Sequence, residues 1–68
     1  MARTYKKIEI VGTSEKGFED AVQNAIAQAR KTLEGLSWFE VSELRGNLQG
    51  PTMVYQVTLK VGFEVKPD

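Results

Sequence analysis

The chain has 68 residues and contains neither cysteine nor histidine, which excludes disulfides and Cys- or His-based catalysis and argues against a zinc site. Nine basic and nine acidic side chains leave a formal net charge of zero, which is not typical of nucleic-acid-binding proteins. A domain of this size buries only about 60% of the surface of its unfolded chain, so we expect oligomerisation to supply further stability.

The N-terminal residues contain no apolar signal-peptide core, and no apolar run approaches the roughly 18 residues that a membrane span requires. No linker, repeat or low-complexity segment divides the chain. We therefore expect a single domain over residues 1–68, a cytoplasmic location and no membrane partner.

The first predicted strand spans residues 4–12, TYKKIEIVG. Ile8 and Ile10 point to one side and Lys7 and Glu9 to the other, which is the alternation of a half-buried strand.

The next segment, residues 13–35, predicts an amphipathic helix of about five turns. We expect Thr13 or Ser14 to cap its N-terminus and Gly35 to end it. Its apolar side chains fall within one sector of a helical wheel: Phe18, Val22, Ala25, Ile26, Ala29 and Leu33.

Two further strands are predicted at residues 37–47 and 52–66. The segment between them, Leu48-Gln49-Gly50-Pro51, has the glycine and proline of a turn, so the two strands should form an antiparallel hairpin. The chain order is therefore strand, helix, strand, strand.

Alternation within the hairpin indicates which side chains face the helix. One face of the last strand is almost wholly apolar and should pack on the helix: Met53, Tyr55, Val57, Leu59, Val61, Phe63 and Val65. If Phe39 and Val41 also face the helix, Trp38 points away from it and lies outside the core of the monomer, with Leu44 on its side of the strand. Arg45 shares the face of Phe39, so it turns outward only if a bulge near residues 44–46 redirects it or if it lies beyond the sheet edge.

Three segments together resemble the dodecins, which are small flavin-binding proteins of about this length: YKKIEIVGTSEKGFEDAVQNAI, LSWFEVSELRG and YQVTLKVGFEV. The resemblance covers essentially the whole chain, and its most specific part is WFEV…RG followed about 17 residues later by YQV. It implies an α+β fold of β-α-β-β order, with a three-stranded antiparallel sheet wrapped around one amphipathic helix. It also implies a hollow homododecamer that binds flavins in pairs where two symmetry-related subunits meet.

The resemblance assigns three residues to the flavin site. Trp38 stacks on the isoalloxazine ring, Gln56 hydrogen-bonds its polar edge, and Arg45 lies near the flavin as in bacterial members. The implied function is storage and buffering of flavin with photoprotective quenching and without turnover. FMN or riboflavin is the expected ligand, with FAD and lumichrome as alternatives. Some bacterial members also bind coenzyme A. Whether this chain binds it is left open, because Gln28 stands where some relatives have a basic residue.

The spacing of the site residues predicts that two chains share each site. A turn centred near Gln49 sets Trp38 opposite residues 60–62, which leaves Gln56 four to six residues further along, or roughly 13–20 Å away. That separation exceeds the length of an isoalloxazine ring, so we expect a neighbouring chain to complete the site.

Alternative readings of these residues remain. Trp38 can anchor the interface of a purely structural homo-oligomer, since aromatic side chains are common at interfaces. An exposed tryptophan beside a basic strand is also compatible with a weak nucleic-acid platform. Glu40, Glu43 and Glu64 have no accompanying nucleophile or base, so we expect neither an enzyme nor a metal site.

Overall fold

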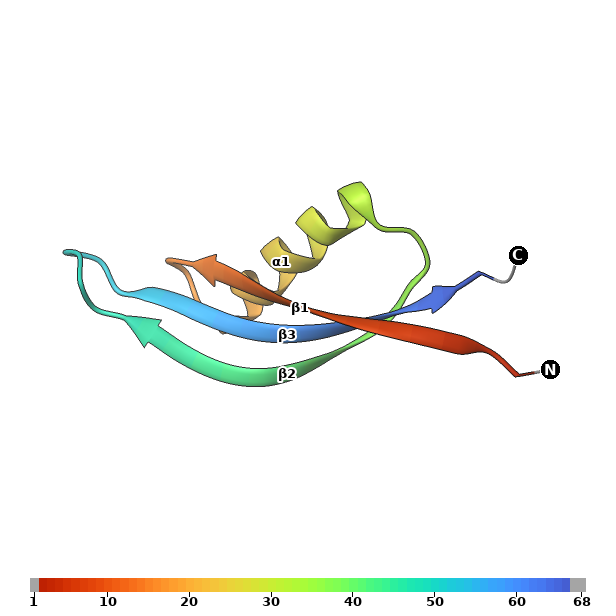
Figure 1. Ribbon diagram of the computed structural model, residues 1–68. Helices are drawn as coiled ribbons and strands as arrows, with labels where there is room; N and C mark the ends of the chain where they lie inside the picture. Colours follow the sequence, from red (N-terminus) through yellow and green to blue (C-terminus); the bar gives the residue numbers. More distant parts are fainter. Residues whose placement is uncertain (1, 67–68) are drawn as a thin grey trace.

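The computed structural model describes residues 2–66, so residues 1, 67 and 68 of the expected domain lie outside the described part. The chain forms four elements: β1 (Thr4–Ser14), α1 (Phe18–Thr32), β2 (Leu36–Asn47) and β3 (Val54–Val65). The strands make one antiparallel sheet in the order β1-β3-β2, and α1 lies on one face of it (Figure 1). The predicted α+β fold, a three-stranded antiparallel sheet around one helix in β-α-β-β order, is confirmed.

The core lies where the central strand meets the helix. Three alternating residues of β3 are fully buried: Val57, Leu59 and Val61. The helix faces the sheet with three small side chains: Ala21, Ala25 and Ala29. Gly12 in β1 allows the closest approach, since a Cβ at this position would overlap the carbonyl oxygen of Ala21. The core is therefore small and depends on tight contact between α1 and the sheet.

The apolar face of β3 is longer than the helix that covers it. The 12 residues of β3 span about 40 Å, whereas the 15 residues of α1 span about 22 Å. Met53, just before the strand, is 45% exposed, and Val65 at its end is 43% exposed. The prediction that the whole set from Met53 to Val65 packs on the helix is therefore correct only for its middle part.

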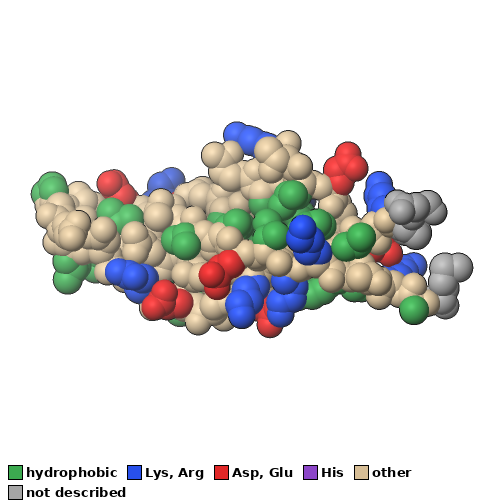
Figure 2. Space-filling model, in the orientation of Figure 1, with side chains coloured by type: hydrophobic (Ala, Val, Ile, Leu, Met, Phe, Trp, Pro, Cys, Tyr) green, Lys and Arg blue, Asp and Glu red, His purple; other side chains and the backbone are tan. Residues whose placement is uncertain are grey.

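The helix packs on β1 and β3 and leaves most of β2 uncovered. Phe39 is 49% exposed although it pairs with the buried Val61, and Val41 and Leu44 on the same side are also exposed. Figure 2 shows apolar side chains along the junction of helix and sheet, and charged side chains of both signs on the side of the sheet away from the helix. The exposed side of β2 is thus an apolar surface of the kind that oligomeric proteins bury.

The predicted N-cap is wrong. The helix begins at Phe18, and its N-cap residue Gly17 makes no side-chain capping bond. Ser14 instead ends β1, where its hydroxyl donates to the Asp20 carboxylate at 2.7 Å and accepts from the backbone N–H of Lys16 at 2.9 Å. Strand pairing with β3 continues through Ser14, which shortens the helix from the expected five turns to about four.

The end of the helix is close to the prediction. Leu33 is the C-cap residue, and its backbone N–H donates to the carbonyl of Ala29. Gly35 lies two residues beyond the cap with φ 72°, a conformation that glycine adopts without steric penalty. Gly35 therefore redirects the chain into β2, although the helix itself ends earlier.

Candidate functional site

The register of β2 against β3 decides which side chains share the face of the sheet away from the helix, here called the outer face. Trp38 pairs with Gly62, and Arg45 pairs with Gln56. Gly62 and Gln56 alternate with the buried residues of β3, so both pairs point to the outer face. Trp38 thus has the orientation that alternation predicted.

Arg45 reaches the outer face because β2 is irregular. The pairing shifts between Val41 and Glu43, so that Ser42 is an extra residue and every later residue of β2 changes face. The bulge lies a few residues earlier than the sequence suggested. For the same reason the expectation that Leu44 shares the face of Trp38 is wrong. Leu44 pairs with the buried Val57 and lies on the helix side of the sheet.

Trp38 lies flat on the backbone of β3. A Cβ built on Gly62 would overlap three consecutive atoms of the indole six-membered ring, Cε2, Cζ2 and Cη2, at nearly equal distances. Nearly equal distances to three adjacent ring atoms place Gly62 under the face of the ring and not at its edge. Trp38 is 39% exposed, and the ring face opposite Gly62 is directed away from the sheet. The outer face therefore carries a flat aromatic platform.

Tyr5 of β1 contacts the edge of this platform. The ring centroids of Tyr5 and Trp38 are 5.1 Å apart with an interplanar angle of 66°, an edge-to-face geometry that aromatic pairs prefer. The strands β1 and β2 are separated by β3, so the contact passes over it. The hydrogen bond with Tyr5, and then the charge of Glu64, raise the pKa of Arg3, whose Nε is 3.6 Å from the Glu64 carboxylate.

An ion pair crosses β3 beside the platform. Lys7 Nζ lies 2.7 Å from Glu40 Oε1. This hydrogen bond, followed by the charge of Lys7, holds the pKa of the Glu40 carboxyl below its ordinary value, with a smaller contribution from the Trp38 side chain. Both charged side chains are about half-exposed, so the pair contributes little to folding. The pair places an ammonium and a carboxylate group beside Trp38.

Gln56 and Arg45 form a second polar group on the same face, remote from Trp38. Gln56 is half-buried and Arg45 is exposed. Gln56 precedes Gly62, the partner of Trp38, by six residues in β3, which corresponds to about 20 Å along an extended strand. The structure thus brings Arg45 and Gln56 together but does not bring either to Trp38 of the same chain.

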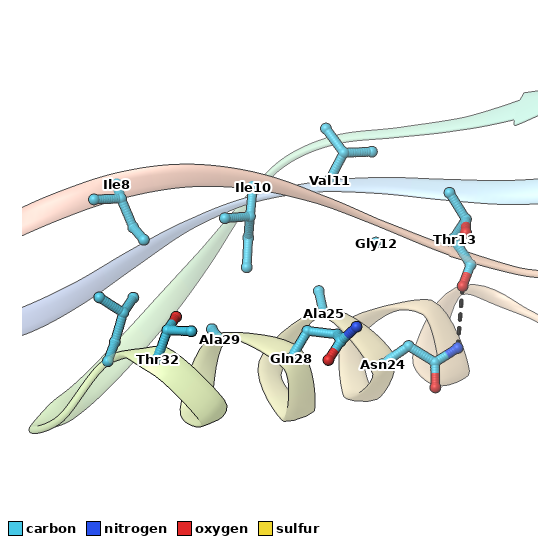
Figure 3. Close-up of a pocket in the computed structure, with 11 residues that line it drawn as sticks. Ile8, Ile10, Val11, Gly12, Thr13, Asn24, Ala25, Gln28, Ala29 and Thr32 are labelled. Atoms are coloured by element: carbon cyan, nitrogen blue, oxygen red, sulfur yellow. Dashed lines mark hydrogen bonds between the residues drawn. The ribbon is translucent and has the colours of Figure 1, made fainter.

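A separate groove of about 520 Å³ lies between α1 and β1. Figure 3 shows Ile8 and Ile10 directed toward the helix and the amide of Asn24 donating to the carbonyl of Thr13, at 3.0 Å. Gln28 lines this groove, whereas none of the three predicted site residues does. Within residues 2–66, no three acidic side chains lie close enough to hold a metal ion. No helix in this part of the chain is long and apolar enough to cross a membrane.

Sequence reasoning did not single out Gly62 or Tyr5. A signal for Gly62 was present, because a glycine inside a strand of large residues often marks a close approach of another group. No comparable signal identified Tyr5, since its contact with Trp38 depends on strand order. Tyr5 and Trp38 belong to strands that are distant in the sequence and are not neighbours in the sheet.

The chain matches the family model described as Dodecin over residues 4–66. It is 54% identical over 67 residues to a dodecin of Thermus thermophilus, with 97% of each chain covered.

Solved structures agree with this match. The tt0972 protein of Thermus thermophilus has a TM-score of 0.91 and 51% identity, covering 98% of this chain and 100% of that chain. A dodecin from Streptomyces davaonensis has a TM-score of 0.90 and 46% identity, with 98% and 100% covered. Sequence and fold therefore agree along nearly the whole length, and the chain belongs to the dodecin family.

Proposed function

We propose that this protein binds flavin for storage, buffering and photoprotection, with the isoalloxazine ring stacked on Trp38 at sites shared between subunits of a hollow homododecamer. One observation carries the proposal: Trp38 lies flat on the bare backbone of Gly62 and offers its other ring face on the outer face of the sheet. A side chain that served only to pack within its own chain would not need this flat, open arrangement. Membership of the dodecin family supports the same function.

The chemistry of the two rings fits this arrangement. An isoalloxazine is large, flat and electron-poor, and indole is the most electron-rich side chain of proteins, so the two stack face to face. Such stacking contributes on the order of 1 kcal/mol beyond the burial of area. A bound flavin would supply an electron-accepting ring, and the Trp38 indole would serve as the electron donor that quenches its excited state, with the electron returned and no product formed.

Gln56 and Arg45 supply the polar contacts in this proposal. The amide of Gln56 has both a donor and acceptors, which match the alternating carbonyl and N–H groups of the flavin edge. Arg45 lies directly beside Gln56 in the sheet. Because about 20 Å of strand separates this pair from Trp38, the flavin that stacks on one chain would meet Gln56 and Arg45 of another. FMN and riboflavin are the proposed ligands.

The uncovered apolar surface supports assembly. Phe39, Val41 and Leu44 are exposed along the helix side of β2, and Met53 and Val65 are exposed beyond the ends of the helix. A domain this small gains stability by burying such surface against further copies of itself.

Flavin titration of the purified assembly tests the function. Wild-type protein should bind FMN or riboflavin and quench its fluorescence. Trp38→Ala should lower the affinity at least about tenfold, which corresponds to about 1.4 kcal/mol, and should restore flavin fluorescence. Trp38→Phe keeps a flat ring that donates electrons poorly, so it should retain more affinity than Trp38→Ala but quench less well than the wild type. A wild-type assembly that binds no flavin would identify the protein as a purely structural oligomer with Trp38 as an interface anchor.

A further inference from the structure

We propose that Tyr5 is a positioning residue that holds the Trp38 indole in the orientation in which it receives flavin. The proposal rests on the proposed function, because it takes Trp38 as the stacking platform. It adds a residue on a different strand, whose own contact with the flavin is not required.

Trp38 needs such support because the sheet contacts one face of its ring and Glu40 contacts the side chain at one further point. The contact below the indole is the backbone of Gly62, which supports one face of the ring but not its edge. Two-fifths of the residue remains exposed, so these contacts leave part of the ring edge without a packed neighbour. A ligand that stacks on a mobile ring must also order that ring, and the lost side-chain freedom lowers the affinity.

Tyr5 supplies a contact at the edge of the indole. Its ring meets the indole edge-to-face at a centroid distance of 5.1 Å. This geometry leaves the outward face of the indole uncovered, whereas a stacked tyrosine would occupy the place of the flavin. The contact therefore restrains the platform without blocking it.

Tyr5 and Trp38 meet only because Gly62 lies between their strands. Lys7 of β1 and Trp38 of β2 both pair with Gly62, and Tyr5 pairs with Glu64 in the next outward-facing row. Neighbouring strands are about 4.8 Å apart, so β1 and β2 are separated by roughly twice that distance. The indole covers a residue with no side chain and so reaches across β3 to the tyrosine ring. Gly62 is accordingly buried beneath the indole.

Charged groups lie beside Tyr5. Arg3 is a neighbour of the Tyr5 side chain and of the Glu64 carboxylate. The ion pair between Lys7 and Glu40 also crosses β3, next to Gly62 and Lys60. The tyrosine is thus one member of a set of contacts that ties β1 to β2 across the outer face.

The test uses Trp38 as its own reporter, since the chain has a single tryptophan. The time-resolved fluorescence anisotropy of Trp38 in the flavin-free assembly reports the motion of the ring. We compare the wild type with Tyr5→Phe, which keeps the aromatic ring, and with Tyr5→Leu and Tyr5→Ala, which remove it. The matched control is Tyr55→Leu, because Tyr55 makes a similar pair with Phe18, at 4.9 Å and 76°, on the opposite face of the sheet.

We expect Tyr5→Leu and Tyr5→Ala to increase the fast motion of the indole and to weaken flavin affinity about threefold to tenfold. Tyr5→Phe should keep the wild-type anisotropy and affinity, and Tyr55→Leu should keep the anisotropy. Tyr5→Leu retains most of the buried volume, so it remains informative if Tyr5→Ala fails to fold.

Two results would overturn the proposal. The first is wild-type anisotropy in Tyr5→Leu, which would show that Tyr5 does not restrain the ring. The second is a mobile ring with unchanged flavin affinity, which would show that the restraint has no role in binding. Failure of the proposed function is distinguishable from both, because the wild type itself would then bind no flavin while the anisotropy comparison would still report on Tyr5.

Discussion

Replacing Gly62 by alanine is a direct test of the platform geometry. The added Cβ would overlap three atoms of the Trp38 ring, so the indole must move or the strand must shift. Overpacking of this kind destabilises a protein by about 1–3 kcal/mol. A glycine-to-alanine change also restricts the unfolded chain, which stabilises by about 0.4–1 kcal/mol where the backbone conformation suits alanine. The overlap is the larger effect, and we expect a net destabilisation of about 0.5–2 kcal/mol.

Gly46→Ala is the matched control, because Gly46 also lies inside a strand of the same hairpin. The nearest atom to a Cβ at this position is the carbonyl oxygen of Val54 at 3.7 Å, an ordinary van der Waals contact. Neither Gly46 nor Gly62 has a positive φ, so neither backbone conformation disfavours alanine. Only the gain from restricting the unfolded chain then applies to Gly46→Ala, and we expect the two substitutions to change stability in opposite directions.

Thermal unfolding at equal protein concentration measures this difference. A change of 1 kcal/mol shifts the Tm of a domain of this size by about 4–8 °C, so Gly62→Ala should melt clearly below Gly46→Ala. Trp38 fluorescence should shift to the red in Gly62→Ala as the ring leaves the sheet, and flavin affinity should fall. If Gly62→Ala matches Gly46→Ala in Tm and leaves the Trp38 emission unchanged, the indole does not lie on Gly62 and the reasoning is refuted.

The ion pair between Lys7 and Glu40 predicts a pH effect. The folded-state pKa of Glu40 is lowered, so the pair stabilises the fold above the unfolded pKa of about 4.3 and loses this effect as the pH falls through the folded value. The Tm difference between the wild type and Glu40→Gln should therefore shrink between pH 7 and pH 3, and a constant difference would show that the pair is not formed. The exposed side of β2 predicts an effect on assembly. Phe39 lines a groove with Ile26 and Arg30, so Phe39→Lys should place a second cation beside Arg30 and reduce the size of the assembly in gel filtration. If Phe39→Lys elutes at the same volume as the wild type, this surface is not part of the interface.

Local patterns in the sequence determined the elements and the direction of most side chains. Alternation along β1 and β3 predicted which side of each strand faces the helix, and in the middle of β3 also which residues are buried, since successive side chains of a strand point to opposite faces regardless of which strand lies beside them. The same rule turned Trp38 outward. Helical periodicity identified α1 for an equivalent reason, because both periods are properties of the backbone itself.

The ends of the elements were predicted less well. Thr13 and Ser14 have good capping side chains, yet both belong to β1, because pairing with β3 continues through them. The competition between a helix cap and two more strand pairs involves a partner some 40 residues away. A local pattern contains no information about that partner.

Tertiary structure alone decided the composition of the outer face. The shift between Val41 and Glu43 turned Arg45 toward Gln56, and a bulge is set by the pairing of two strands, which a single strand's alternation does not reveal. The contact between Tyr5 and Trp38 required the strand order β1-β3-β2 and a glycine in the central strand. The sequence by itself thus determined that an indole would face outward, and the packing of three strands determined what lies beneath it, what holds its edge and how far away Gln56 and Arg45 lie.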